Sequence, residues 1–206
     1  MRFNNPDTLS ALHNLASSYS YLGDYNKACE LQNAVHNARK EILGEKHPDT
    51  LNSLNNLASS YSYLGDYNKA CKLQNAAYNA RKEILGETHP DTLTSLNNLA
   101  IFYSYLGDYN KACELQNAVY NVCKEILGEN HPDTLLVLSN LLVSQVHQDK
   151  TDNESIKNHM IAYFENITNL KITAFSIKEV SFRRNYLVLF NRVYRQYEMT
   201  RRKQKK

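Results

Sequence analysis

The sequence predicts an all-α protein, a solenoid of stacked helix pairs, and three observations support this prediction. The tetrapeptide Pro-Asp-Thr-Leu begins at Pro6, Pro48, Pro90 and Pro132, so the chain repeats every 42 residues. Each copy holds two apolar patterns that step by three or four residues, as one face of a helix does. Glycines separate these patterns at fixed places in each of the three full copies. A fixed period of this length is typical of helical repeat arrays.

The copies are nearly identical. The first and second differ at 8 of 42 positions, and so do the second and third. Such close identity predicts that each copy folds into the same helix pair and stacks on its neighbour in the same way. The three full copies are residues 5–46, 47–88 and 89–130, and a partial fourth covers residues 131–150.

The first helix of the middle copy is predicted from a single apolar stripe of about four turns. Asp49 is a candidate N-cap, because its carboxylate can accept hydrogen bonds from the free N–H groups of the first turn. Pro48 then stands just before the cap, where its missing N–H costs nothing. The stripe consists of Leu51, Leu54, Leu57, Ala58, Tyr61 and Leu64.

The second helix follows a break at Gly65-Asp66 and ends at Gly86. Glycine can adopt the left-handed conformation that ends a helix and reverses the chain. The small side chains of Ala70 and Ala77 indicate close approach of two helices. One helix pair cannot cover its own apolar stripe, so the array is expected to be stable only when the pairs stack. This second stripe consists of Tyr67, Ala70, Leu73, Ala77, Ala80 and Ile84.

These residues carry a family resemblance. The order Leu54, Asn56-Leu57-Ala58, Tyr61, Gly65, Tyr67, Ala70 and Ala77 resembles the tetratricopeptide repeat signature. The phrases HPDTLNSLNNLA and RKEILGE, with the period of 42, are similar to the longer repeats of kinesin light chains. The resemblance covers about residues 5–147 and implies a right-handed superhelix with a concave face that holds peptides.

The chain departs from the family pattern at two places. A glutamine stands in each second helix where a bulky aromatic residue is usual, and we expect looser packing between pairs there. The fourth copy has Leu142 and Gln145 in place of the alanine and the tyrosine, and lacks the turn glycine, so the regular array is expected to end with it. The three glutamines are Gln32, Gln74 and Gln116.

A candidate peptide-binding groove follows from the resemblance, since first helices line the concave face of tetratricopeptide arrays. The stripe rotated by one residue from the core stripe is expected to face the groove. Amides and hydroxyls there suit hydrogen bonding to a peptide backbone, and tyrosines add apolar area with a polar tip. The candidate residues are Ser10, His13, Ser17, Ser20 and Tyr21 in the first copy, Asn52, Asn55, Ser59, Ser62 and Tyr63 in the second, and Thr94, Asn97, Ile101, Ser104 and Tyr105 in the third.

Two interpretations of this stripe stay open. The positions are either ligand contacts or ordinary solvated helix positions. Three of the five positions differ between copies, which fits either tuning for a ligand or unconstrained drift. The stripe lacks the Lys and Arg residues with which related domains hold acidic peptides or terminal carboxylates. The resemblance therefore implies peptide binding in general and neither of those ligands.

No motif indicates an enzyme, a metal site or a bound cofactor, and we expect no small-molecule substrate. His47, His89 and His131 are 42 residues apart at equivalent corners and are better explained by packing at helix starts. Neither a nucleophile elbow nor a phosphate-binding glycine loop is present. The four cysteines form no CxxC pair, so we interpret them as reduced thiols.

The predicted second domain, residues 151–206, is a helical extension that covers the end of the array at residues 1–150. Its net charge is +7, against −4 for the array. The chain ends in a basic run at Arg201, Arg202, Lys203, Lys205 and Lys206, which is either idle or able to bind nucleic acid, acidic protein or anionic membrane.

A binding module is therefore the leading functional hypothesis, with a protein or peptide as its partner. One alternative is a nucleic-acid-associated protein that uses the basic run, and another is a truncated repeat product without an independent function. The chain shows no signal peptide and no apolar run near the roughly 20 residues of a membrane span, so we expect a cytoplasmic protein.

Overall fold

The computed structural model describes residues 5–148 and His159, and within them it contains seven long α-helices and no strand. The prediction of an all-α repeat solenoid is confirmed. Helices α1 to α5 belong to a compact unit that ends at Gly107, and α6 and α7 belong to a second unit that begins at Asp108. The helices are α1 (Pro6–Tyr21), α2 (Tyr25–Leu43), α3 (Pro48–Tyr63), α4 (Tyr67–Leu85), α5 (Pro90–Tyr105), α6 (Tyr109–Leu127) and α7 (Pro132–His147).

The first helix of each pair begins one step earlier than the sequence predicted. The N-cap of α3 is His47, whose Nδ1 accepts a hydrogen bond from the backbone N–H of Asp49 at 3.2 Å. Pro48 is therefore the first helical residue, where its fixed φ suits the helix. Asp49 lies in the first turn, where its negative charge interacts favourably with the positive end of the helix dipole. The assignment of Asp49 as the cap was wrong, and the equivalent histidines at the other helix starts act as caps too.

The turns inside the pairs follow the prediction. Gly65 has φ +80°, a conformation that strains any residue with a Cβ. Directly after it, the Asp66 carboxylate accepts a hydrogen bond from the backbone N–H of Lys69 at 3.0 Å and caps α4. The pair of glycine and aspartate thus ends one helix and starts the next within three residues.

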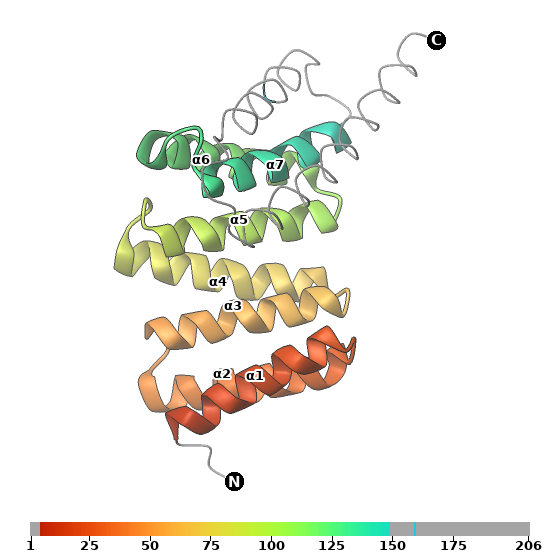
Figure 1. Cartoon of the computed structure of the whole chain (residues 1–206), viewed down its shortest axis with the longest axis vertical. Coiled ribbons are helices and arrows are strands. Elements are labelled where there is room, and N and C mark those ends of the chain that lie inside the picture. Colours follow the sequence, from red (N-terminus) through yellow and green to blue (C-terminus); the bar gives the residue numbers. More distant parts are fainter. Residues whose placement is uncertain (1–4, 149–158, 160–206) are drawn as a thin grey trace, which may run out of the picture. The chain divides into compact units, whose positions relative to one another are not determined.

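Within the first unit, each helix packs against the next one in the chain, and Figure 1 shows α1 to α5 as successive layers. Leu57, Ala58, Ala70 and Ala77 are buried at these contacts, as predicted. Ala70 and Ala77 have no exposed surface, which agrees with close approach of the helices. The last residues of the two predicted stripes, Leu64 and Ile84, are exposed, however.

The glutamines were expected to loosen the packing between pairs, and the structure shows what Gln74 contacts. This side chain on α4 is fully buried. Its Nε2 donates hydrogen bonds to Asn55 Oδ1 on α3 at 2.9 Å and to the Ser95 carbonyl on α5 at 3.1 Å. The glutamine therefore joins three helices, because its amide can bond to groups that an aromatic ring would only contact.

In the second unit, α6 packs against α7, and three leucines of α7 are fully buried: Leu135, Leu138 and Leu141. Of the predicted extension, only His159 lies within the described residues. Its Nδ1 lies 3.1 Å from Gln145 Oε1, and its ring meets the Tyr120 ring edge-on at 5.8 Å between centroids. The rest of the extension, including the basic run, lies outside the described residues.

In residues 5–148, none of the helices combines the length and the apolar character that crossing a membrane requires.

Candidate functional site

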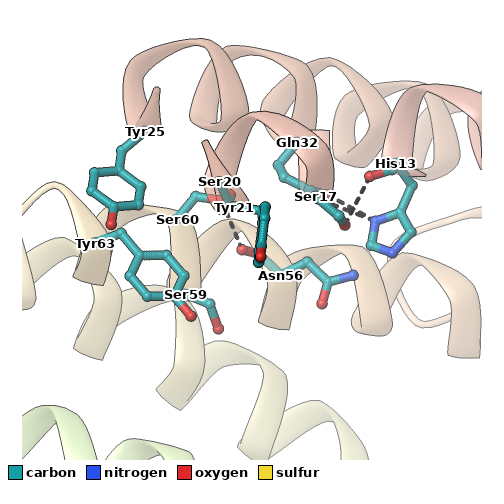
Figure 2. A pocket seen from close by; sticks show the side chains of 10 residues that line it. All are labelled: His13, Ser17, Ser20, Tyr21, Tyr25, Gln32, Asn56, Ser59, Ser60 and Tyr63. Atoms are coloured by element: carbon teal, nitrogen blue, oxygen red, sulfur yellow. Dashed lines mark hydrogen bonds between the residues drawn. The ribbon is translucent and has the colours of Figure 1, made fainter. Parts of the chain in front are cut away.

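A cleft of about 510 Å³ lies between α1 and α3 in the first unit. Both are first helices of their pairs, the helices that the sequence analysis placed along a groove. Figure 2 shows its ten lining residues, among which His13 lies toward one end and the rings of Tyr25 and Tyr63 toward the other. The full lining is His13, Ser17, Ser20, Tyr21, Tyr25, Gln32, Asn56, Ser59, Ser60 and Tyr63.

Six of these ten residues were predicted from the sequence as groove residues: His13, Ser17, Ser20, Tyr21, Ser59 and Tyr63. Four were missed: Tyr25, Gln32, Asn56 and Ser60. Tyr25 and Gln32 lie on α2, the second helix of the first pair, and the prediction placed only first helices along the groove. The recurrence of Gln and Tyr at the same positions in three copies was a signal that could have found them.

At one end of the cleft, a histidine and a glutamine are paired. The buried Gln32 places its Nε2 at 3.1 Å from His13 Nδ1, and so fixes the ring of His13. The Ser17 hydroxyl donates to the His13 carbonyl at 3.0 Å, and the Ser59 and Ser60 hydroxyls likewise donate to carbonyls four residues earlier. These three hydroxyl protons are therefore already used within their own helices.

At the other end, Tyr25 on α2 stacks on Tyr63 on α3, with ring centroids 5.3 Å apart and planes 14° apart. The next copy repeats this contact, since Tyr67 on α4 meets Tyr105 on α5 at 5.2 Å. Tyr21 is 92% exposed. Tyrosine pairs thus recur along the first unit, one for each junction between copies.

The phenolic hydroxyls of Tyr21, Tyr25 and Tyr63 make no hydrogen bond within the described part of the chain, and neither does the Asn56 side-chain amide. These groups line the cleft, and each can donate or accept a hydrogen bond. The cleft lining contains no Asp, Glu, Lys or Arg. A ligand there would meet flat aromatic surface and neutral hydrogen-bonding groups.

In the middle copy, two of the predicted groove residues accept hydrogen bonds from buried side chains of the second helix. Asn55 accepts from Gln74, as described above, and Asn52 Oδ1 accepts from Arg81 Nη2. Arg81 is only 3% exposed and also donates to Ser95 Oγ at 2.7 Å. Burial lowers the pKa of the Arg81 guanidinium from its ordinary value, and the nearby Asp91 carboxylate opposes this shift.

The remaining predicted groove residues differ in accessibility and do not line the cleft. Ser10, Asn52 and Thr94 are exposed, and Asn55, Ser62, Ile101 and Ser104 are half-buried. Tyr105 is exposed beside Tyr67. Asn97, expected to face solvent, is only 8% exposed. The cleft is thus formed by the first two copies.

Other candidate chemistry is sparse. Among residues 5–148 and His159, no group of three or more His, Cys, Asp or Glu side chains is placed to hold a metal ion. Cys29, Cys71, Cys113 and Cys123 are buried free thiols, and burial raises the pKa of Cys71 and of Cys113 to about 11. A thiol that keeps its proton at neutral pH is a poor nucleophile.

Comparison with known proteins identifies repeats of one kind along the described helices. The family model for the tetratricopeptide repeat matches residues 7–83 and 54–112, and a second model of the same description matches residues 92–133. No curated protein sequence matches the chain.

Solved structures agree with the chain in fold. A protein from Podosopora anserina, described as a kinesin light chain with nearly identical TPR-like repeats, superposes with a TM-score of 0.71 at 24% identity, over 84% of this chain and 81% of that one. A point variant of that protein gives 0.76 at 22% identity, over 97% and 91%. BtubC (BKLC) from P. vanneervenii gives 0.73 at 20% identity, over 97% of this chain and 78% of that one.

Proposed function

Because this chain belongs to the tetratricopeptide repeat family, whose repeats serve as scaffolds for protein–protein interaction, we propose that it holds an extended segment of a partner protein in the cleft between α1 and α3. The observation that carries this proposal is the cleft itself. Its lining combines exposed aromatic rings with hydroxyl and amide groups that have no partner among the described residues. Ligand pockets commonly join apolar lining to a few placed polar groups in this way.

The fixed orientation of a polar side chain supports the proposal. Gln32 holds the ring of His13, so this lining residue need not be ordered when a ligand arrives. Preorganisation of this kind raises affinity because less side-chain entropy is lost on binding.

Selection from a displayed library of random peptides on the full chain, followed by calorimetry of the selected peptides, tests the proposal. Ser59→Arg places a long charged side chain in the cleft and is expected to weaken binding of the selected peptides at least tenfold, about 1.4 kcal/mol. Asn75→Arg adds the same side chain at an exposed position of α4 that does not line the cleft, and is the matched control.

Thermal melting of both variants checks that they are folded. Equal binding by the wild type and a folded Ser59→Arg variant would place the binding surface elsewhere. Failure to select any peptide would refute the proposal itself.

A further inference from the structure

The chemistry of the cleft indicates a class of ligand. Its lining contains three tyrosines and no charged residue, so neither an acidic nor a basic peptide finds an ion-pair partner there. Burying a charged ligand group without a partner costs free energy. The ligand segment in the cleft is therefore expected to be uncharged.

Hydrogen-bonding capacity narrows the class further. The serine protons at positions 17, 59 and 60 are donated to helix carbonyls, whereas the phenols of Tyr21, Tyr25 and Tyr63 and the amide of Asn56 have no partner among the described residues. Each phenol can donate a hydrogen bond to a ligand carbonyl, and its oxygen can also accept one. A ligand backbone whose carbonyls are free can therefore accept from these hydroxyls.

We infer that the cleft binds a proline-rich segment in the polyproline II conformation, an inference that rests on the proposed function above. A polyproline II helix has no internal hydrogen bonds, so its carbonyls are free to accept from the tyrosine hydroxyls. Proline lacks an N–H and adds a flat apolar ring, and grooves lined by aromatic rings recognise such segments. The stiff segment also loses little entropy on binding.

The repeated aromatic pairs extend the inference to ligand length. The stacked pair of Tyr25 and Tyr63 lines the cleft, and the pair of Tyr67 and Tyr105 follows one copy further along the same unit. A short proline segment contacts the first pair. A longer segment can reach the second pair as well and is expected to bind more tightly.

Fluorescence anisotropy with a labelled decaproline peptide tests the inference, with a glycine–serine peptide of equal length as the control ligand. We expect saturable binding of decaproline and none of the control. Since no charges pair, the affinity is expected to stay nearly constant between about 0.05 and 0.5 M NaCl. Removing one aromatic anchor typically costs more than 1 kcal/mol, so Tyr63→Ala is expected to weaken binding about tenfold.

Two further variants separate a contact from a structural effect. Tyr63→Phe keeps the stacked ring but loses the donor, and is expected to fall between the wild type and Tyr63→Ala. Tyr105→Ala removes the residue at the equivalent position of the next copy, outside the cleft lining, and is expected to weaken decaproline binding less than Tyr63→Ala does. A proline peptide of about five residues spans roughly 15 Å and is expected to bind Tyr105→Ala as tightly as it binds the wild type.

The inference is overturned if decaproline binds no better than the glycine–serine control, or if Tyr63→Ala and Tyr105→Ala weaken decaproline binding equally. The peptides selected from the random library separate a failure of the proposed ligand class from a failure of the proposed function. If they bind in a manner that depends on Ser59 while decaproline does not bind, the ligand class is wrong and the proposed function stands. If neither binds, both are refuted.

Discussion

Two leucines at the same repeat position test the idea that each helix pair is stabilised by its neighbour. Leu15 on α1 and Leu57 on α3 are equivalent in sequence, but Leu57 is 3% exposed and Leu15 is 45% exposed. The difference arises because α2 covers α3, while no described helix precedes α1. The chemistry of the two side chains is identical, so only the neighbour differs.

The expected magnitudes follow from burial. Truncating a buried leucine to alanine removes its transfer free energy and leaves a cavity, which costs about 2–5 kcal/mol. We expect Leu57→Ala to lower the free energy of unfolding by about 3 kcal/mol within that range. Leu15 is roughly half-buried, and solvent fills the space it leaves, so Leu15→Ala is expected to cost about 1 kcal/mol or less.

Urea unfolding followed by circular dichroism at 222 nm measures both values. Leu99, which is also 3% exposed at the same position of the third copy, provides a second buried site for comparison. Equal destabilisation by Leu15→Ala and Leu57→Ala would refute the reasoning, because it would mean that the outer face of α1 packs against a surface that the described residues do not include.

Three other outcomes are expected. Gln74→Ala removes two hydrogen bonds worth roughly 0.5–1.5 kcal/mol each and leaves a cavity. Urea unfolding is expected to show that the free energy of unfolding falls by about 3 kcal/mol. A fall of less than about 1 kcal/mol would contradict the role of Gln74 in joining three helices. Burial lowers the pKa of His36 below its ordinary value of 6.5, so the unfolded chain binds a proton at a higher pH than the folded chain does and stability falls as the pH drops below that value. His36→Tyr, which restores the residue of the second and third copies, is expected to reduce that fall when unfolding is compared at about pH 7 and pH 5; an unchanged pH dependence would show that His36 does not contribute. Burial raises the pKa of Cys71 and of Cys113 to about 11, so we expect native protein to react slowly with iodoacetamide at about pH 8 and unfolded protein to react fast. Rapid labelling of the native protein would show that these thiols are accessible.

Most of the local structure could be predicted from the sequence because it depends on neighbours in the chain. The apolar step of three or four residues marks the helices, and Gly65 and Gly86 mark their ends with positive φ angles. The helix starts were less certain, since His47 and Asp49 both carry groups that can accept from a free backbone N–H. The choice between them depends on whether Pro48 is helical, which the spacing of apolar residues does not determine.

The burial of polar side chains could not be predicted in the same way, since it depends on residues from other helices. Arg81 has the composition of a surface residue, yet it is buried because Asn52 and Ser95 from two neighbouring helices accept its hydrogen bonds. The equivalent Arg39 in the first copy is half-buried, and among the described residues it donates only to the Asp49 carbonyl. Nearly identical copies therefore place equivalent residues in different environments.

At the predicted groove, a constant buried glutamine lies beneath a position that varies between copies and is half-buried in the first two. The glutamine on the second helix is the same in the first two copies, and it orients His13 in one and Asn55 in the other. Under the proposed function, a substitution at the variable position changes what the ligand meets, while the buried glutamine can still supply a hydrogen bond. The proposed ligand surface could then change from copy to copy while the glutamine beneath it stays buried. The differences between copies at these positions are then expected to alter ligand preference more than stability.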